Sequence, residues 1–494
     1  MAASSGAITR QELSGLPPSM LLIGGDWRSA SGGAQIPVIN PSDGEPFTTI
    51  ARGTAADIDA AVAAARAALD GAWGRMTATE RGRLLMRLAL AVEDHHDELA
   101  RLEAMDTGKP LKQAKADIVA LARYFEYYGG AADKVHGETI PYLDGYAVMT
   151  FREPHGVTAH IIPWNYPAQI LGRSLGAALA MGNAAVVKPA EDACLSVLKV
   201  GELVLAVGFP PGAINIVTGY GEEAGAALAA HPGIDHISFT GSPETGALVQ
   251  AAAARNNRPV TMELGGKSPQ IVFADADLDA ALPVLTNAIV QNAGQTCSAG
   301  SRLLVEATIY DDLLSRIAAR FADLRVGSFD MDLDCGPLIN ADQKKRVDGF
   351  LAAAREDGLV LRAEGKIAPN TPPGGYYVAP TLIADVPPTH RLAQDEVFGP
   401  VLAATPFRDE EEAIRLANGT AYGLVAGVWT RDGGRQLRLA KAIKAGQVFV
   451  NNYGAGGGVE LPFGGVKRSG FGREKGFEAL YSFSVVKTVA VKHG

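Results

Sequence analysis

The sequence has 494 residues, and because a single domain rarely exceeds roughly 250 residues we expect two or three domains. Hydrophobic residues make up 47% and charged residues 20%, which excludes a disordered chain, and 57 Gly and 28 Pro without a triplet period exclude collagen. The 45 Lys and Arg against 54 Asp and Glu give a net charge of −9, which argues against nucleic acid or an anionic membrane as the main partner.

The three cysteines, Cys194, Cys297 and Cys335, are too few for a disulfide framework, and without a CxxC pair a structural zinc site is not expected. The nine histidines lack metal-ligand spacing, so we predict no metal site. Residues 1–20 lack the apolar segment of a secretory signal, and no apolar stretch reaches the ~20 residues of a membrane helix. We therefore predict a cytoplasmic protein.

The chain begins with a loose arm over residues 1–20 and continues with helices. Apolar residues at helical spacing predict helices over 57–70, over 79–105 with Thr79 as N-cap, and over 111–128. Gly129 and Gly130 are predicted to stop the third helix.

From about residue 156, short β-branched runs alternate with Ala-rich helical runs, which indicates parallel strands joined by right-handed crossovers. The tail, 481–492, alternates as an edge strand does, and a free edge invites pairing with another chain. Helices of the first series are predicted at 169–180, 193–207, 222–230 and 245–254. Strands are predicted at 157–162, 184–187, 214–217 and 236–239, and in a second series at 270–273, 302–305, 425–429 and 447–451.

Two glycine-containing turns compete as the phosphate cradle of a dinucleotide. Residues 219–224 (GYGEEA) fit the loose fingerprint, but their two glutamates would place negative charge where a pyrophosphate sits. In residues 239–246 (FTGSPETG) a strand runs into Ser242, with Pro243 at the first position of a helix. Taken alone, the second turn is equally typical of an ordinary capped connection.

Lys188 and Glu191 follow a predicted buried strand, at the edge where open parallel sheets bind ligands. These two side chains suit the hydroxyls of an adenosine ribose. The Glu191 carboxylate would repel a 2′-phosphate, which favours NAD over NADP. The alternative is a solvated charge pair.

Three further residues are candidates for chemistry. Cys297 lies among small and polar residues, Glu263 precedes two glycines at a strand end, and Asn165 lies in a Pro-bounded turn where its amide suits an oxyanion. Each has an ordinary alternative, namely a structural thiol, a surface carboxylate and a turn residue. No histidine stands beside Cys297, which weakens a cysteine–histidine hydrolase.

Together these segments resemble the NAD(P)-dependent aldehyde dehydrogenase superfamily. The Glu-to-Cys gap from Glu263 to Cys297 is also the one that the family shows. Seven motifs occur in the family's order: PWN at 163–165, KPAE at 188–191, FTGSPETG at 239–246, MELGGKSP at 262–269, GQTCS at 294–298, EVFGPV at 396–401 and PFGGVKRSGFGREKG at 462–476.

The resemblance implies an α/β fold with two doubly wound parallel-sheet domains and a small β oligomerisation flap. The Rossmann-like NAD-binding domain would span 1–130 and 152–262, and the catalytic domain 263–465. The flap would combine 131–151 with 466–494 and join the chain into a homodimer or homotetramer.

The resemblance also implies a role for each site residue. Cys297 would be the nucleophile, Glu263 the general base, and Asn165 with the backbone N–H of Cys297 the oxyanion hole. Pro243 stands where the family usually has Thr, which puts fine cofactor geometry in doubt. The implied cofactor-binding residues are Lys188 and Glu191 for the adenosine ribose, Ser242 for the pyrophosphate, Glu396 and Phe398 for the nicotinamide riboside, and Ile161, Ile162, Pro163, Trp164, Gly221, Phe239, Gly241, Thr245 and Leu264.

The implied reaction oxidises a small-molecule aldehyde to a carboxylic acid with NAD, through a thiohemiacetal and a thioester on Cys297 that water hydrolyses with Glu263 as base. Two enzyme classes remain as alternatives. A cofactor-free cysteine hydrolase would leave Lys188, Glu191 and Glu396 without a role. A CoA-acylating aldehyde dehydrogenase would transfer the thioester, but such relatives usually lack the glutamate.

Arg173 and Phe463 are expected on the substrate side. Relatives that oxidise carboxylate-bearing semialdehydes, and some that oxidise aromatic aldehydes, have Arg at the position of Arg173. The second Arg of succinic semialdehyde relatives is Gln291 here. A salt bridge to a neighbouring subunit is the alternative role of Arg173. Residues 452–458, rich in glycine, are expected at the mouth of the substrate site.

Overall fold

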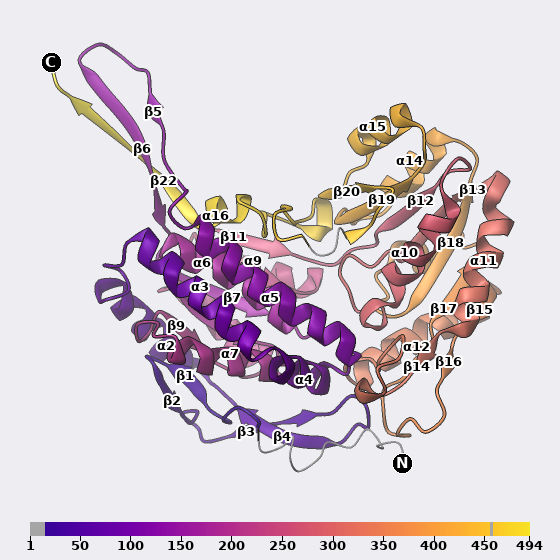
Figure 1. The fold of residues 1–494 in the computed structure, drawn as a ribbon, viewed down its shortest axis with the longest axis horizontal. Helices are drawn as coiled ribbons and strands as arrows, with labels where there is room; N and C mark the ends of the chain where they lie inside the picture. The colour runs from indigo at the N-terminus through magenta and orange to yellow at the C-terminus, as the bar shows by residue number, and fades with distance from the viewer. Residues whose placement is uncertain (1–14, 455–457) are drawn as a thin grey trace.

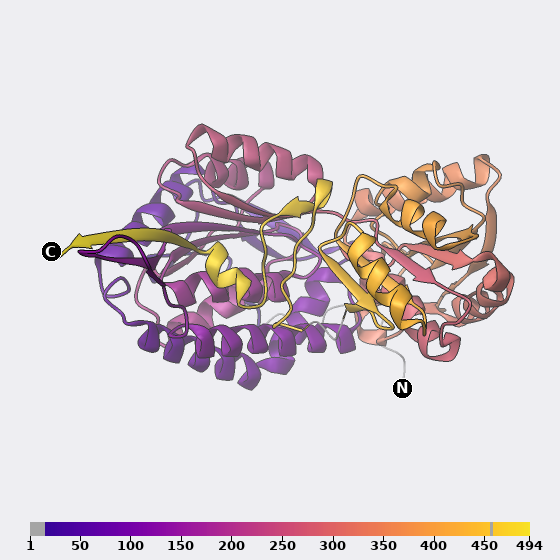
Figure 2. The same cartoon turned by 90° about the horizontal axis from the view of Figure 1, so that it is seen from above.

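The computed structural model describes residues 15–454 and 458–494, so most of the predicted N-terminal arm and three residues of the predicted substrate mouth lie outside the described residues. Two α/β units lie side by side, and a narrow sheet projects from the first (Figure 1). Figure 2 shows helices on both faces of the first sheet. None of the helices in the described part of the chain is long and apolar enough to cross a membrane.

The first sheet has the order β2-β1-β9-β8-β7-β10-β11-β21, and its five central strands are parallel. The chain passes from β7 through β8 to β9, then returns to the other side of β7 for β10 and β11. The order therefore reverses between β7 and β10, which is where such sheets bind ligands. The bounds are β1 (Leu21–Ile23), β2 (Asp26–Arg28), β7 (Val157–Ile162), β8 (Ala184–Pro189), β9 (Ile214–Ile216), β10 (His236–Thr240), β11 (Val260–Glu263) and β21 (Gly470–Phe471).

These strands form because their apolar residues are buried on both faces by the connecting helices, as in other parallel sheets. The predicted helix over 222–230 is divided, since residues 221–225 form a π-helical turn before α8. The connecting helices are α6 (Pro167–Met181), α7 (Leu195–Ala206), α8 (Ala226–Ala230) and α9 (Pro243–Arg255).

The second sheet has the order β15-β17-β18-β13-β12-β19-β20, and all but β15 are parallel. Only residues 264–268 separate the end of β11 from the start of β12, so the carboxyl edge of the first sheet meets the amino edge of the second. The bounds are β12 (Pro269–Val272), β13 (Arg302–Glu306), β15 (Val360–Glu364), β17 (Thr381–Ala384), β18 (Val401–Phe407), β19 (Val425–Trp429), β20 (Gln447–Val450), α10 (Leu278–Val290), α11 (Tyr310–Asp323), α12 (Ala341–Glu356), α13 (Arg391–Gln394), α14 (Glu410–Asn418) and α15 (Gly433–Ala442).

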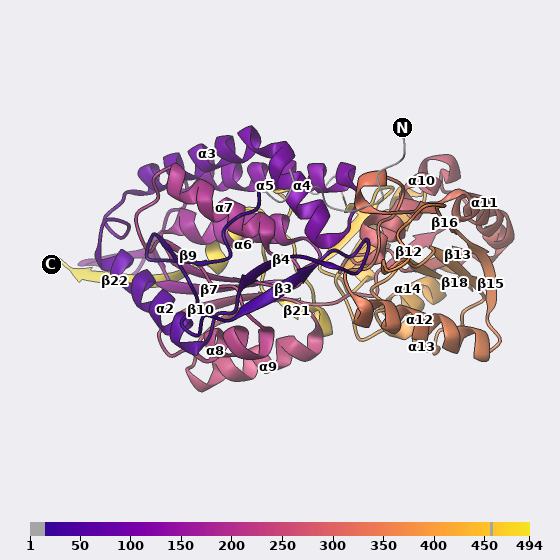
Figure 3. The ribbon, with the colours of Figure 1, turned by 90° about the horizontal axis from the view of Figure 1, so that it is seen from below.

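This arrangement confirms the predicted α/β class with two parallel-sheet units. Two small pairs complete it, the hairpin β3–β4 on the underside in Figure 3 and the parallel pair β14–β16. Their bounds are β3 (Gln35–Ile39), β4 (Pro46–Ala51), β14 (Arg325–Val326) and β16 (Lys366–Ile367).

The N-terminal helices differ in two ways from their prediction. The segment 79–105 is not one helix, because His95 leaves helical geometry (φ −105°, ψ 20°) and separates α3 from α4. The N-cap of α3 is Thr77 rather than Thr79, since Thr77 forms a reciprocal capping box with Glu80. The bounds are α2 (Ala55–Asp70), α3 (Ala78–Asp94), α4 (His96–Thr107) and α5 (Leu111–Ala131).

Gly129 and Gly130 do not stop α5, which continues to Ala131. Gly129 instead permits close contact with α3, because a Cβ there would lie 3.0 Å from the carbonyl oxygen of Gly82. The glycine therefore serves helix packing rather than termination.

The projecting sheet has the order β22-β6-β5 and is antiparallel. Its strand β22 lies at one edge, as predicted for the tail, although the strand starts at Ser484 because the preceding residues form α16. Figures 1 and 2 show that this sheet extends away from both units. The bounds are β5 (Thr139–Ile140), β6 (Tyr146–Pro154), α16 (Glu478–Ser482) and β22 (Ser484–Lys492).

A buried ammonium group connects the N-terminal helices to the turn after β7. The Nζ of Lys109 donates to Glu103 of α4 (3.0 Å), to Asp117 of α5 (2.6 Å) and to the main-chain carbonyl of Asn165 (3.1 Å). The side chain of Lys109 is fully buried. Although burial alone lowers the pKa of Lys109, the charges of Asp117 and Glu103 raise it above its ordinary value, so the ammonium keeps its charge.

Replacing this ammonium should destabilise the protein. Lys109→Met leaves two buried carboxyl groups without their cation, and we expect a loss of about 3–5 kcal/mol in the free energy of unfolding. Lys112→Met is the control, because Lys112 is exposed and its removal should change stability by less than about 0.5 kcal/mol. Urea unfolding followed by circular dichroism measures both variants. Equal urea midpoints for wild type and Lys109→Met would contradict the stabilising role of the buried ammonium.

Candidate active site

A cavity of about 470 Å³ lies at the carboxyl ends of β7 and β10, beside the reversal of strand order. Trp164 and Phe398 contact each other edge to face across it, with ring centroids 5.4 Å apart. Of the predicted site residues, those that line this cavity are Pro163, Trp164, Asn165, Gly241, Ser242, Cys297, Glu396 and Phe398.

Glu396 is fixed by the linker between the two sheets. Its Oε1 accepts a hydrogen bond of 2.8 Å from the backbone N–H of Gly266. A Cβ at Gly265 would lie 2.2 Å from Oε2, so only glycine leaves room for this carboxyl group. Burial raises the pKa of Glu396 to about 7.

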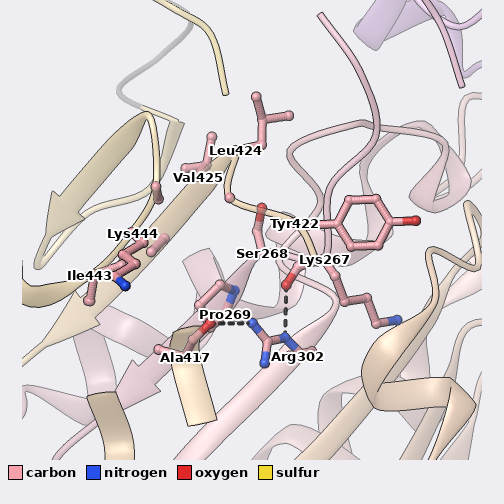
Figure 4. A pocket seen from close by; sticks show the side chains of 13 residues that line it. Lys267, Ser268, Pro269, Arg302, Ala417, Tyr422, Leu424, Val425, Ile443 and Lys444 are labelled. Atoms are coloured by element: carbon pink, nitrogen blue, oxygen red, sulfur yellow. Dashed lines mark hydrogen bonds between the residues drawn. The ribbon is translucent and has the colours of Figure 1, made fainter. Parts of the chain in front are cut away.

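Arg302 also holds this linker in place. Its buried guanidinium donates to the carbonyl oxygens of Lys267 (2.8 Å), Leu416 (2.8 Å) and Ala417 (2.9 Å). Figure 4 shows this arginine beneath the linker, beside a small cavity of about 10 Å³. The donors of one side chain thus tie residues 264–268 to α14.

Ser242 is the N-cap of α9, and its hydroxyl oxygen accepts from the backbone N–H of Thr245 at 3.2 Å. Pro243 occupies the first turn of α9 as predicted. The helix therefore presents its amino end to the cavity, where the helix dipole favours an anion.

Lys188 and Glu191 form a pair at the end of β8, with Nζ 2.8 Å from Oε2. The other carboxylate oxygen of Glu191 accepts from the backbone N–H of Gly221 at 3.3 Å. Burial raises the pKa of Glu191, but the Lys188 ammonium and its hydrogen bond hold it below its ordinary value. Neither Lys188 nor Glu191 lines the 470 Å³ cavity.

The remaining predicted cofactor residues do not line this cavity, namely Ile161, Ile162, Gly221, Phe239, Thr245 and Leu264. Ile162 and Phe239 are buried in the core of the first unit, and Ile161 and Leu264 pack against that core. A Cβ at Gly241 would lie 2.5 Å from the Phe239 ring, so the ring packs directly against the turn that contains Gly241.

A second cavity, of about 540 Å³, shares Asn165 and Cys297 with the first. The predicted substrate residues Arg173 and Phe463 both line it. Tyr453 and Gly454 line it too, while residues 455–457 lie outside the described residues. Its aromatic walls are Tyr124, Tyr166, Phe449, Tyr453 and Phe463.

Cys297 follows a strained turn. Asn292, Ala293 and Gly294 have φ values of 50°, 51° and 73°, so two non-glycine residues in succession adopt the left-handed region. The thiol is partly exposed and packs against Phe463, Leu424 and Val425. Burial raises the pKa of Cys297 to about 12, although the guanidinium of Arg173 opposes this shift.

Asn165 is held at both of its amide groups. Its side-chain Nδ2 donates to the carbonyl oxygen of Gln295 at 3.0 Å. Its main-chain carbonyl accepts from Lys109 and from Nδ2 of Asn292 at 2.9 Å. Because an amide nitrogen has two hydrogens, one donor of Asn165 remains for a ligand oxygen.

Glu263 ends β11 and lines neither cavity, although the sequence places it with the catalytic residues. Its carboxyl group is buried, and neither oxygen has a hydrogen-bond partner among the described residues. A Cβ at Gly464 would lie 2.7 Å from its Oε1. Burial and the neighbouring Glu474 raise the pKa of Glu263 well above its ordinary value.

Arg173 forms an ion pair within the chain, with the buried Glu474. It also donates to Thr240 at 3.2 Å. Gln291, which occupies the position of the second arginine of succinic semialdehyde relatives, donates to the hydroxyl of Tyr166 at 2.9 Å.

Sequence reasoning missed several lining residues. Arg346 and Arg391 both place their guanidinium groups near the ring of Phe350 at the first cavity, and Lys475 lines the second. Arg346, Phe350 and Arg391 lie outside the seven motifs, whereas Lys475 lies within the motif at 462–476 without having been assigned a role.

Comparison with known proteins identifies the family. The chain matches the aldehyde dehydrogenase family over residues 27–489. Hydroxyisobutyraldehyde dehydrogenase of Mycolicibacterium austroafricanum is 43% identical over 476 residues, which cover 96% of this chain and 94% of that protein. The chain belongs to the aldehyde dehydrogenase family.

Solved structures agree with this assignment. A chain from Burkholderia cenocepacia assigned to the aldehyde dehydrogenases superposes with a TM-score of 0.96 at 68% identity, covering 96% of this chain and 100% of that one. Betaine aldehyde dehydrogenase of Staphylococcus aureus, solved in complex with NAD+, gives a TM-score of 0.94 at 35% identity, covering 98% and 96%. The predicted enzyme class, an aldehyde dehydrogenase, is confirmed.

The raised pKa of Cys297 predicts how the dehydrogenase reacts with an alkylating agent. Only the thiolate is nucleophilic, so the rate of alkylation by iodoacetamide should rise about tenfold per pH unit between about pH 7 and pH 9. Mass spectrometry of the peptide that contains Cys297 measures this rate. The buried Cys194 and Cys335 serve as internal controls that remain unlabelled in the native enzyme. A rate that levels off within this range would contradict the raised pKa.

Proposed function

We propose that this aldehyde dehydrogenase uses Cys297 as nucleophile, Asn165 as oxyanion donor and Glu263 as general base. The observation that carries the proposal is the position of Cys297 and Asn165 at the junction of two cavities. One cavity then holds the oxidant and the other the aldehyde, so that both reach the same sulfur.

The first cavity fits NAD. It lies at the reversal of strand order, the amino end of α9 suits a pyrophosphate, and Gly265 leaves room for the Glu396 carboxyl group. Glu396 and Phe398 are proposed to hold the nicotinamide riboside, and Lys188 with Glu191 the adenosine ribose. When bound, NAD supplies the acceptor for the hydride that leaves the aldehyde carbon. The anionic Glu191 accepts from ribose hydroxyls and disfavours the 2′-phosphate of NADP.

In the proposed mechanism the Cys297 thiol releases its proton to solvent, and the thiolate adds to the aldehyde carbon while the carbonyl π electrons move to the oxygen. The nearby guanidinium of Arg173 favours the thiolate. The alkoxide that forms accepts from the free N–H of the Asn165 amide and from the backbone N–H of Cys297. Because hydrogen bonds hold both ends of Asn165, its donor needs no reorganisation as charge develops.

The resulting thioester on Cys297 is proposed to be hydrolysed by water that Glu263 deprotonates. Burial makes this carboxylate a stronger base than an exposed one, since its pKa is raised. A cofactor-free hydrolase would leave the cavity beneath Glu396 and Phe398 without a function. A CoA-acylating enzyme would not need Glu263.

Substitution of the base should separate the two half-reactions. Glu263→Gln keeps the first step but loses hydrolysis, so rapid mixing with NAD and aldehyde should give one equivalent of NADH per site with little further turnover. Cys297→Ser, the matched control, should give no burst yet still bind NAD, measured by titration calorimetry. Full steady-state turnover of Glu263→Gln would exclude it as the base.

The substrate is proposed to be a carboxylate-bearing semialdehyde or an aromatic aldehyde. The aromatic walls of the second cavity support the latter and Arg173 the former. The place of the second arginine found in succinic semialdehyde relatives is occupied by Gln291, which donates to the hydroxyl of Tyr166.

We further propose that the projecting sheet joins copies of the chain into a homodimer or homotetramer. Its edge strand β22 has the exposed apolar residues Val485, Val486 and Val491, and β6 has Phe151. Exposed apolar residues on a free edge favour pairing with another chain. A reducing compartment such as the cytoplasm suits an enzyme with a catalytic thiol and two more unpaired cysteines.

Light scattering coupled to size exclusion tests the assembly. Wild type is expected at twice or four times the mass of 51.5 kDa. Val486→Lys places a charge on the exposed strand and should shift the enzyme toward monomers. A monomeric wild type would contradict the proposed assembly.

A further inference from the structure

Thr296 immediately precedes the proposed nucleophile, and its hydroxyl group belongs to a chain of hydrogen-bonded side chains along the proposed substrate cavity. The Oγ1 of Thr296 lies 2.9 Å from the hydroxyl oxygen of Tyr166. That phenol oxygen also accepts from Nε2 of Gln291 at 2.9 Å and from Nε2 of Gln113 at 3.3 Å. All four residues line the cavity of about 540 Å³, together with Cys297.

The hydrogen bonds around Tyr166 determine which way the hydroxyl hydrogens point. The Oε1 of Gln113 accepts from the backbone N–H of Asn292 at 2.9 Å, which leaves its Nε2 facing Tyr166. Since a hydroxyl group has a single hydrogen and two amides already donate to the Tyr166 oxygen, the phenol hydrogen is directed to Thr296. Burial raises the pKa of Tyr166 above its ordinary value, so the phenol keeps this hydrogen at neutral pH.

The hydroxyl group of Thr296 therefore accepts from Tyr166 and must direct its own hydrogen elsewhere. Among residues 15–454 and 458–494 that hydrogen has no acceptor, and the Cys297 thiol is not one. Thr296 is only 8% exposed, and the exposed part belongs to the wall of the cavity. A buried hydroxyl donor without an acceptor is unfavourable, and an oxygen atom of a bound ligand would satisfy it.

The position of Thr296 in the chain limits which ligand oxygen its hydroxyl group can reach. The Cα atoms of consecutive residues are about 3.8 Å apart, and Thr296 and Cys297 line the same cavity. When the sulfur of Cys297 is bonded to the aldehyde carbon, the hydroxyl group is close to the first substrate atoms beyond that carbon. The aromatic side chains Phe449 and Phe463 offer apolar surface to the rest of the molecule.

We propose that Thr296 is a specificity-determining residue whose hydroxyl group donates to an oxygen atom on the carbon next to the aldehyde group. The cavity then prefers α-oxygenated aldehydes to their hydrocarbon counterparts. The inference rests on the proposed function, in which this cavity holds the aldehyde. Gln113, Tyr166 and Gln291 act as positioning residues, because they determine where the Thr296 hydrogen points.

Two aldehydes of equal length test this preference. The probes are methoxyacetaldehyde, which has an ether oxygen on the α carbon, and butanal, which has a methylene group in place of that oxygen. The measured quantity is the ratio of their kcat/KM values, because intrinsic reactivity cancels when variants are compared by this ratio. In Thr296→Val, which keeps the shape of the side chain and removes its donor, the ratio should fall about three- to tenfold. Thr296→Ser keeps the donor and should keep the ratio close to that of wild type.

Thr286→Val is the matched control. Thr286 is also buried, but its hydroxyl group donates to the carbonyl oxygen of Leu282 within α10 at 2.9 Å, and it lines neither cavity. The same substitution there should leave the ratio unchanged. A fall in Thr286→Val as large as that in Thr296→Val would overturn the specific role of Thr296.

Thr296→Ala and Thr296→Ser repeat the comparison with smaller side chains, so the test does not depend on the folding of Thr296→Val. These two variants differ only by the hydroxyl group, and the alanine variant should have the lower ratio by about three- to tenfold. Equal ratios in this pair, or an unchanged ratio in a folded Thr296→Val, would overturn the inference while aldehyde oxidation persists. A wild-type enzyme that forms no NADH with either probe or with benzaldehyde would instead contradict the proposed function.

Discussion

The active site depends on one main-chain carbonyl group, that of Asn165. It accepts hydrogen bonds from the buried ammonium of Lys109 and from the side chain of Asn292. Asn165 belongs to the turn after β7, at the carboxyl edge of the first sheet, whereas Asn292 precedes Cys297 in the second unit. The same oxygen therefore holds Asn165, the proposed oxyanion donor, beside the segment that leads to Cys297, although the two come from different sheets. Because Lys109 is held by carboxyl groups of two helices, the whole N-terminal helical layer supports this contact.

The turn before Cys297 shows why such support is needed. Successive left-handed residues are unfavourable and persist only where the surroundings determine them. Asn292 is bound through its backbone to Gln113 and through its side chain to Asn165, so the turn is fixed from the first unit. As a result of this turn, Cys297 lines both cavities while it packs against Phe463.

Much of this architecture follows from local signals. The parallel strands were predictable because their apolar runs are short, and Cys297, Asn165 and Glu396 because each lies in a contiguous motif. The partner of Arg173 was not, since Glu474 belongs to a distant segment and only the fold brings the two together. The break at His95 also escaped prediction, because the apolar spacing continues through it. Lys475 lies within the motif at 462–476, but only the structure shows that it is buried with a left-handed backbone.

Glu263 differs from the other proposed catalytic residues, Cys297 and Asn165, in its position. Its carboxyl group lies at the end of β11, near Gly464, and lines neither cavity. Glu263 raises the pKa of Cys297 even from this position, which opposes the first step of the proposed mechanism, whereas the guanidinium of Arg173 lowers that pKa. The base is required only later, when water attacks the thioester. A neutral Glu263 suits the proposed addition and an anionic Glu263 suits the proposed hydrolysis, so the two steps place opposite electrostatic demands on one buried carboxyl group.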